Sequence, residues 1–190
     1  MNTFVDTGRK LLPRAERRAQ ILAAARTAFA RDGYAATTIE QVARESGVTA
    51  TIIYRHFAGK PDLYRAVLDD VRDRLRVATS GRPDLVRAAV AAAASDPDGF
   101  RLLFRHVARE PEFDSWAADF RSRSSLVADS ALPAEIPDPA RRAWVATLLT
   151  TLSVETILTW LDAGRPASEE TVATAIDAAS AALIATIGAP

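Results

Sequence analysis

Apolar residues recur at intervals of three and four along most of the chain, which is the spacing of amphipathic helices. The pattern predicts a first helix that begins at Pro13, a residue suited to a first turn, and ends at Asp32-Gly33. Residues 1–12 are expected to form a flexible basic arm before it. The inner face of this helix is formed by Ile21, Leu22, Ala25 and Phe29.

Two short helices are predicted next. Thr37 or Thr38 is a suitable N-cap for the second helix, which ends before Gly47. Thr49 is a suitable N-cap for the third helix, which is expected to run to about Phe57. The inner face of the second helix is formed by Ile39, Val42 and Ala43.

The rest of the chain follows the same periodicity. A long fourth helix is predicted after a break at residues 58–61, and five more helices are separated by proline and glycine. These five are expected at about residues 84–95, 97–109, 112–130, 138–163 and 168–188. Alternating strand patterns are absent. The sequence therefore predicts an all-α protein of about nine helices, with a three-helix domain in residues 1–60 and a larger helical domain in residues 61–190.

Composition excludes several functions. The 190 residues are 48% apolar and 25% charged, as in a soluble globular protein. The chain has no cysteine, and its two histidines are too far apart in sequence to suggest a metal site. We therefore expect no cofactor, no metal and no enzymatic activity. No signal segment is recognisable and no apolar run approaches the roughly 20 residues that span a bilayer, so we expect a cytoplasmic protein with no membrane partner.

Charge is distributed unevenly along the chain. The net charge is zero, but residues 1–60 hold ten basic and five acidic residues, a net charge of +5. The remaining residues hold 14 basic and 19 acidic residues, a net charge of −5. A basic N-terminal part joined to an acidic remainder is typical of a protein that meets nucleic acid at one end.

Residues 37–60 have the pattern of two short helices joined by a tight turn. Gly47 supplies the left-handed backbone conformation that such a turn needs. An ordinary three-helix core is the alternative interpretation. The arrangement favoured here is a helix-turn-helix, whose second helix enters the major groove of DNA. The two helices are expected to pack through Val42, Ala43, Val48 and Ile53.

The spacing of these residues resembles a known family. The pattern is Thr38-x-x-x-Val42-Ala43-x-x-Ser46-Gly47-Val48, followed by Ile53-Tyr54-x-His56-Phe57-x-x-Lys60. It is similar to the DNA-binding head of TetR-type (TetR/AcrR) transcriptional regulators over about residues 14–76. Beyond residue 80 the chain resembles that family only in helix count, length and composition.

The resemblance implies a DNA-contacting role for individual residues. Thr38 is expected to contact phosphate from the start of a helix. Tyr54, His56 and Lys60 match positions that typically hold phosphates, and Arg55 is placed to reach a base edge, preferably guanine. Four residues at the start of the recognition helix are expected to face the groove: Thr49, Ala50, Thr51 and Ile52.

Three of these residues depart from the family pattern, which often has glycine where this chain has Thr51. The family often has polar residues where this chain has Ala50 and Ile52. An exposed face with these two side chains would read few bases by hydrogen bonding, so we expect more reliance on Arg55 and on phosphate contacts. Five basic residues near the N-terminus either contact DNA or are solvated, and both interpretations stay open: Arg9, Lys10, Arg14, Arg17 and Arg18.

The larger domain is expected to bind a small molecule because the resemblance implies an inducer. Aromatic residues at helical spacing usually form core, although some line cavities between helices. Glu155 lies in an otherwise uncharged stretch, so we expect a buried carboxylate paired with a ligand, a second copy of the chain or an arginine. The candidate ligand-binding residues are Phe104, His106, Trp116, Phe120, Trp144 and Glu155.

The last two predicted helices carry apolar stripes that either face the chain's own core or pair with a second copy. The resemblance favours a homodimer through these helices. We therefore predict a sequence-specific repressor that binds a palindromic double-stranded DNA operator and is released by a largely apolar inducer. A helical protein-interaction adaptor that retains the helix-turn-helix is the alternative. The stripes are formed by Leu148, Leu149, Leu152 and Thr156, and by Val172, Ile176, Ala179, Leu183 and Ile187.

Overall fold

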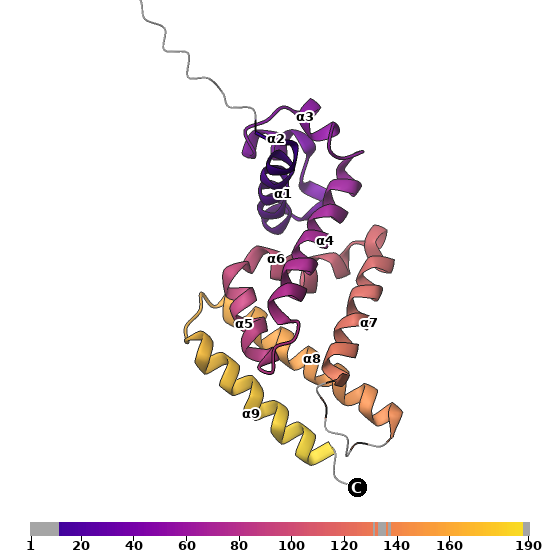
Figure 1. The fold of residues 1–190 in the computed structure, drawn as a ribbon, viewed down its shortest axis with the longest axis vertical. Helices are drawn as coiled ribbons and strands as arrows, with labels where there is room; N and C mark the ends of the chain where they lie inside the picture. Colours follow the sequence, from indigo (N-terminus) through magenta and orange to yellow (C-terminus); the bar gives the residue numbers. More distant parts are fainter. Residues whose placement is uncertain (1–11, 131, 133–135, 137, 188–190) are drawn as a thin grey trace, which may run out of the picture.

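The computed structural model describes residues 12–130, 132, 136 and 138–187, and the regular structure in this part of the chain is entirely helical. Three helices, α1 (Arg14–Ala36), α2 (Ile39–Glu45) and α3 (Ala50–Tyr54), lie together at one end of the molecule (Figure 1). The long helix α4 (Lys60–Thr79) leads from this head into the remaining helices. The predicted all-α fold with about nine helices is confirmed.

Local sequence signals determine where the helices of the head begin and end. Gly33 has a φ of 80°, so regular helical geometry in α1 is interrupted where the sequence predicted an end. Thr38 is the N-cap of α2, and its hydroxyl oxygen accepts a hydrogen bond from the backbone N–H of Gln41. Thr37 is buried instead, and its hydroxyl donates to the carbonyl oxygen of Gly33 at 2.7 Å.

The turn between α2 and α3 has the geometry that the sequence predicted. Gly47 has a φ of 65°, a backbone conformation that side chains with a Cβ rarely adopt. The hydroxyl of the buried Ser46 donates to the carbonyl oxygen of Val42 at 2.7 Å, which closes the end of α2. Helix α3 is shorter than predicted because it ends at Tyr54, three residues before Phe57.

The body of the molecule follows α4. It contains α5 (Leu85–Ser95), α6 (Pro97–Arg101), α7 (Asp114–Ser130), α8 (Pro139–Asp162) and α9 (Glu169–Ile187). Helix α7 packs against α8, and α9 packs against both α5 and α8. The bounds of α5, α8 and α9 agree within one residue with those predicted from the sequence.

The prediction of a single α-helix over residues 97–109 is wrong. Helix α6 ends at Arg101 and continues as a π-helical segment (Leu102–His106) and a 3₁₀ turn (Val107–Arg109). Leu102, Leu103 and Val107 are all buried in the core that also contains residues of α1 and α4. A second 3₁₀ turn, Pro111–Phe113, precedes α7.

The largest hydrophobic core joins the head to the body. It begins with Ile21 and Phe29 of α1, includes the inner face of α4, and extends to Ala117 and Phe120 of α7. The domain boundary predicted after residue 60 therefore falls at the start of a helix whose inner face belongs to this common core. A displacement of the body can consequently reach the head through direct packing.

Helices α8 and α9 are less buried than their composition suggests. By length and composition each could cross a membrane, with a mean hydropathy of 1.3 in its most apolar window. The sequence did not indicate this, because the expectation rested on uninterrupted apolar runs. Only 33% of that window in α8 and 17% in α9 is buried within the chain. Length and composition of this kind also occur in helices of soluble proteins that pack on a partner.

An aromatic cluster fixes the junction between α1, α4 and the segment before α7. The ring centroid of Tyr64 lies 4.8 Å from that of Phe29, 4.9 Å from that of Tyr34 and 4.7 Å from that of Phe113. Tyr64 is completely buried, and its hydroxyl has no hydrogen-bond partner among the described residues. Burial is accordingly the largest cause that raises the pKa of Tyr64.

Replacing Tyr64 by phenylalanine is expected to raise the free energy of unfolding by about 1 kcal/mol, since an unpaired buried hydroxyl costs about 1–3 kcal/mol. The measurement is urea denaturation at one protein concentration. Tyr34→Phe is the matched control, because it removes a hydroxyl that donates to Glu112 at 2.8 Å and should lower stability slightly. A loss of stability in Tyr64→Phe comparable to that of Tyr34→Phe would contradict this account.

Candidate DNA-binding interface

The recognition helix α3 presents a more polar surface than the sequence suggested. Thr49, Thr51, Tyr54 and Arg55 are exposed. Ala50 and Ile52, which were expected to dominate this face, are partly buried and pack against the core of the head. They are turned inward because Ile53 and Phe57 anchor this short segment in the core. The surface available to a DNA groove therefore consists mainly of hydroxyl groups and one guanidinium.

Thr38 lies at the exposed start of α2. Its hydroxyl oxygen accepts the N–H of Gln41 at 3.1 Å, which leaves the hydroxyl proton free to be donated to a phosphate oxygen. The predicted phosphate contact is compatible with this geometry. Thr49 has no comparable side-chain cap on α3.

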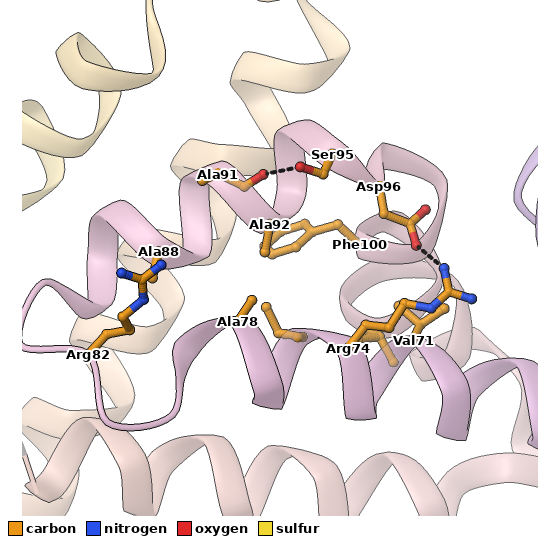
Figure 2. A pocket seen from close by; sticks show the side chains of 12 residues that line it. Val71, Arg74, Ala78, Arg82, Ala88, Ala91, Ala92, Ser95, Asp96 and Phe100 are labelled. Carbon is orange, nitrogen blue, oxygen red and sulfur yellow. Dashed lines mark hydrogen bonds and ion pairs between the residues drawn. The ribbon is translucent and has the colours of Figure 1, made fainter.

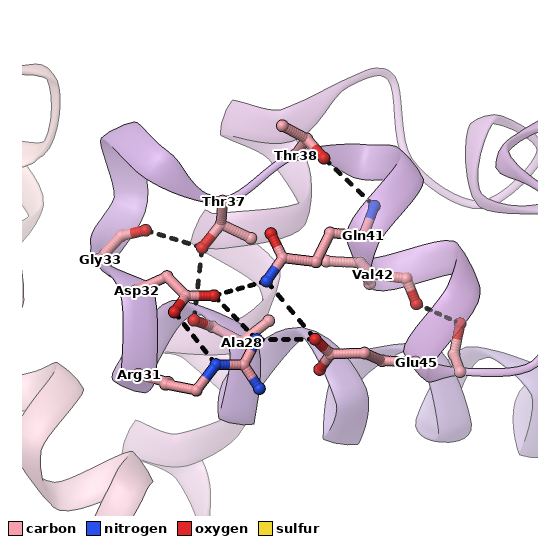
Figure 3. A network of polar contacts seen from close by, with 10 residues as sticks. Ala28, Arg31, Asp32, Gly33, Thr37, Thr38, Gln41, Val42 and Glu45 are labelled. Atoms are coloured by element: carbon pink, nitrogen blue, oxygen red, sulfur yellow. Dashed lines mark hydrogen bonds and ion pairs between the residues drawn. The ribbon is translucent and has the colours of Figure 1, made fainter.

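A polar network on the surface of the head holds α2 against α1 (Figure 3). A guanidinium nitrogen of Arg31 lies 2.8 Å from a carboxylate oxygen of Asp32 and 2.7 Å from one of Glu45. Gln41 donates to both carboxylates. Hydrogen bonds from Arg31 lower the pKa of Asp32 and that of Glu45, so both stay ionised and paired near neutral pH. Their negative charge is thus partly neutralised near the proposed DNA surface.

Basic residues of the first turns of α1 lie close to the end of α3. The guanidinium of Arg18 lies 5.1 Å from the ring centroid of Phe57. His56 has an Nδ1 atom that is buried and has no hydrogen-bond partner among the described residues. Burial is the largest cause that lowers the pKa of His56, and the positive charges of Arg14, Arg18 and Arg17 lower it further.

These three arginines belong to α1, as expected of a helix that begins at Pro13. Arg9 and Lys10, the other two of the five basic residues for which a DNA contact was left open, lie outside the described residues. Arg14 and Arg18 form no ion pair within the described chain, and Arg17 is hydrogen-bonded to Gln20. The start of α1 therefore brings basic side chains close to His56 and Phe57, which follow α3.

Lys60 has a structural partner that the sequence did not reveal. Its ammonium group donates to the carbonyl oxygen of Ala35 at 3.0 Å and lies 4.5 Å from the ring centroid of Tyr34. It thereby binds the carboxyl end of α1. An ammonium group has three donors, so the phosphate contact predicted for Lys60 remains a prediction beside this role.

The candidate ligand-binding residues do not form one site. Phe120 lies 5.1 Å from Phe104 and 5.5 Å from Trp116, measured between ring centroids, and these three rings are packed together. The indole N–H of Trp116 donates to Asp69 of α4 at 3.0 Å. His106 lies in the π-helical segment, where burial is the largest cause that lowers its pKa.

Two of the candidates lie on the surface of α8. The side chain of Trp144 is 54% exposed, and Glu155 is also exposed. The expectation of a buried Glu155 is therefore wrong for the single chain, and its pairing with a second copy stays a prediction. An uncharged neighbourhood in the sequence suggested burial, but here it reflects an apolar helix with an uncovered face.

A groove that the sequence did not reveal lies between α4 and α5 (Figure 2). Its volume is about 360 Å³, and none of the six candidate ligand-binding residues lines it. The run of alanines in α5 is the feature of the sequence that could have indicated this groove, because small side chains leave space beside a neighbouring helix. Among the described residues, no group of three or more His, Asp or Glu side chains is placed to hold a metal ion.

Known proteins share both the head and the overall fold. The profile of the family described as "Bacterial regulatory proteins, tetR family" matches residues 21–67. The "HTH-type transcriptional activator FasR" of Mycolicibacterium smegmatis is 33% identical over 176 residues, which cover 84% of this chain and 78% of that protein. The chain belongs to the TetR family. It is thus a DNA-binding transcriptional regulator and not an enzyme, as the motif in residues 37–60 predicted.

Solved structures extend the similarity to the body of this TetR-family regulator. A TetR-like regulator from Rhodococcus sp. RHA1 superposes with a TM-score of 0.79 at 17% identity, covering 92% of this chain and 99% of that one. NalD of Pseudomonas aeruginosa, the secondary repressor of the MexAB-OprM multidrug efflux pump, superposes with a TM-score of 0.66 at 21% identity, covering 88% and 96%. At these identities the likeness establishes the fold alone.

DNA binding is expected to strengthen as the pH falls from about 7.5 to about 6. A phosphate beside the arginines of α1 would offset their charge and raise the pKa of His56, so binding would take up a proton. The affinity gain is at most about tenfold for each unit by which the pKa rises. The measurement is fluorescence anisotropy with a fixed operator at constant ionic strength.

His56→Gln is the control for this pH dependence. The variant should bind with an affinity that changes little over the same interval. An equal pH dependence in the variant and the parent protein would show that another group takes up the proton.

Proposed function

We propose that this TetR-family regulator is a homodimeric repressor of a palindromic operator and that a largely apolar inducer releases it from DNA. The observation that supports this most directly is the arrangement of two surfaces. The helix-turn-helix is exposed at one end of the chain, and the uncovered apolar faces of α8 and α9 lie towards the other (Figure 1). A two-fold axis through α8 and α9 would leave both recognition helices free.

The exposed side of α9 favours a helix partner. Val172, Ala173 and Ile176 are buried in the chain's own core, so part of the predicted stripe is already occupied. The opposite side has exposed alanine and threonine residues, which permit close approach of another helix. Together with the exposed indole of Trp144 on α8, this surface is expected to form a four-helix interface with a second copy.

Two recognition helices in such a dimer would contact successive major grooves, about 34–36 Å apart. The core that joins α1 and α4 to the body supports control by a ligand, since a shift in the body would alter the spacing of the heads. A ligand changes DNA binding only as far as its affinity differs between the two states. The proposed location of such a regulator is the bacterial cytoplasm.

Repression is the proposed direction of control, although the relative from M. smegmatis is named an activator. A reporter gene placed behind an operator selected from random DNA tests this directly. Removal of the regulator should raise expression, and a fall in expression would indicate activation. Failure to bind any DNA at low salt would favour the alternative of a protein-interaction adaptor.

Arg55→Ala is expected to relax base preference at one position of each half-site and to cost about 1–3 kcal/mol at that position. Arg55 is the exposed guanidinium at the end of α3, where it can reach a base edge. The measurement is selection from random DNA followed by affinity for single-base variants of the operator. Arg123→Ala is the control, since Arg123 pairs with Asp119 on α7 at 2.8 Å. An unchanged preference in Arg55→Ala would remove it from base recognition.

Ala178→Arg and Ala182→Arg, on the exposed side of α9, are expected to convert the dimer to monomers, because each places a charge in an apolar interface. Operator affinity should fall when dimerisation is lost, since only a dimer binds both half-sites at once. Mass by light scattering and a gel shift measure the two effects. Ala118→Arg, at an exposed position of α7, is the control and should remain dimeric. If the α9 variants remained dimeric and bound the operator with unchanged affinity, the dimer interface would lie elsewhere.

A further inference from the structure

The groove between α4 and α5 combines an apolar wall with charge at its two ends (Figure 2). Eight of its twelve lining residues are apolar, and four of these are alanines, whose small side chains create the space. The volume of about 360 Å³ lies within the range of about 300–1,000 Å³ that small-molecule sites occupy. The groove therefore has the size and surface for the apolar part of a small ligand.

The charges at the two ends differ in how they are compensated. Arg74 forms an ion pair with Asp70 and lies 3.7 Å from Asp96 at one end. Arg82 lies at the other end, where its side chain is exposed and has no ion pair or hydrogen bond within the described chain. The uncompensated positive charge of the groove is thus at the Arg82 end.

We infer that the groove binds an amphipathic organic carboxylate, with its apolar chain along the alanines and Phe100 and its carboxylate on Arg82. A guanidinium forms short, charge-assisted hydrogen bonds with a carboxylate, and nothing else in the described chain competes for this one. The inference rests on the proposed function in one respect, because it identifies the chemical class of the inducer. It places that ligand apart from the packed rings of Phe104, Trp116 and Phe120.

Asp96 connects the groove to the DNA-binding head. Its carboxylate lines the groove, accepts the N–H of Gly99 at 3.0 Å to cap α6, and lies 2.8 Å from a guanidinium nitrogen of Arg26 in α1. Arg26 is 19% exposed, and Asp96 is its ion-pair partner in the described chain. The backbone of Gly99 packs tightly against Asp96 and Val71, since a Cβ added at Gly99 would lie 2.6 Å from Asp96 and 2.7 Å from Val71. A ligand that separates α5 from α4 would therefore move Asp96 away from Arg26.

Binding is tested by isothermal titration calorimetry with dodecanoate, dodecan-1-ol and dodecyltrimethylammonium, each below its aggregation concentration. Dodecanoate should bind most tightly. Arg82→Ala should weaken dodecanoate by about tenfold and leave dodecan-1-ol unchanged, and Arg76→Ala, an exposed arginine of α4 outside the groove, should change neither. Equal binding of all three probes, or of dodecanoate to Arg82→Ala and the parent protein, would overturn the inference.

Coupling to the head is tested by anisotropy with a selected operator. Saturating dodecanoate should change operator affinity by at least about fivefold in the parent protein, the lower end of typical coupling between two sites. Arg26→Gln, which lies outside the groove, should bind dodecanoate normally but lose most of this change. Coupling that persists in Arg26→Gln would overturn the role of the Asp96–Arg26 contact. A protein that binds no DNA would contradict the proposed function, while calorimetry would still decide whether the groove binds the carboxylate.

Discussion

The structure depends on the shared hydrophobic core between the head and the body. Helices α1 to α3 form a unit of only 41 residues, which is close to the size below which a chain buries too little apolar surface to fold alone. The unit is completed by the inner face of α4 and by the segment from Leu102 to Phe120. Tyr64 lies at the centre of this junction, in contact with rings from α1 and from the segment before α7.

This constraint explains how a five-residue recognition helix can have a defined position. A helix of this length is unstable in isolation because it has little more than one turn. Ile53 and Phe57 hold it in the core, and Gly47 and Ser46 fix its angle to α2. The orientation of the DNA-reading surface is therefore a property of the packing of α1 and α4, and those two helices also contact the body.

The charges of the chain follow the same division. Two acidic groups of the head, Asp32 and Glu45, are paired with Arg31, whereas Arg14, Arg18 and Arg55 have no ion pair within the described chain. At the groove, the carboxylate of Asp96 both caps α6 and forms an ion pair with Arg26 of the head. Ion pairs thus stabilise the fold, while arginines without an ion pair lie at the proposed DNA-binding and ligand-binding surfaces.

The sequence by itself determined the features that depend on neighbouring residues. Helical periodicity located most helices, Gly33 and Gly47 marked turns, and the spacing from Thr38 to Lys60 identified the family. Only the tertiary structure decided that Ala50 and Ile52 turn inward, that residues 97–109 break into π-helical and 3₁₀ turns, and that Lys60 binds the end of α1. It also decided that Glu155 is exposed and that a groove opens beside α5. The physical reason is that each of these depends on contacts between segments far apart in the chain, whereas caps, turns and periodicity are set by residues within a few positions of one another.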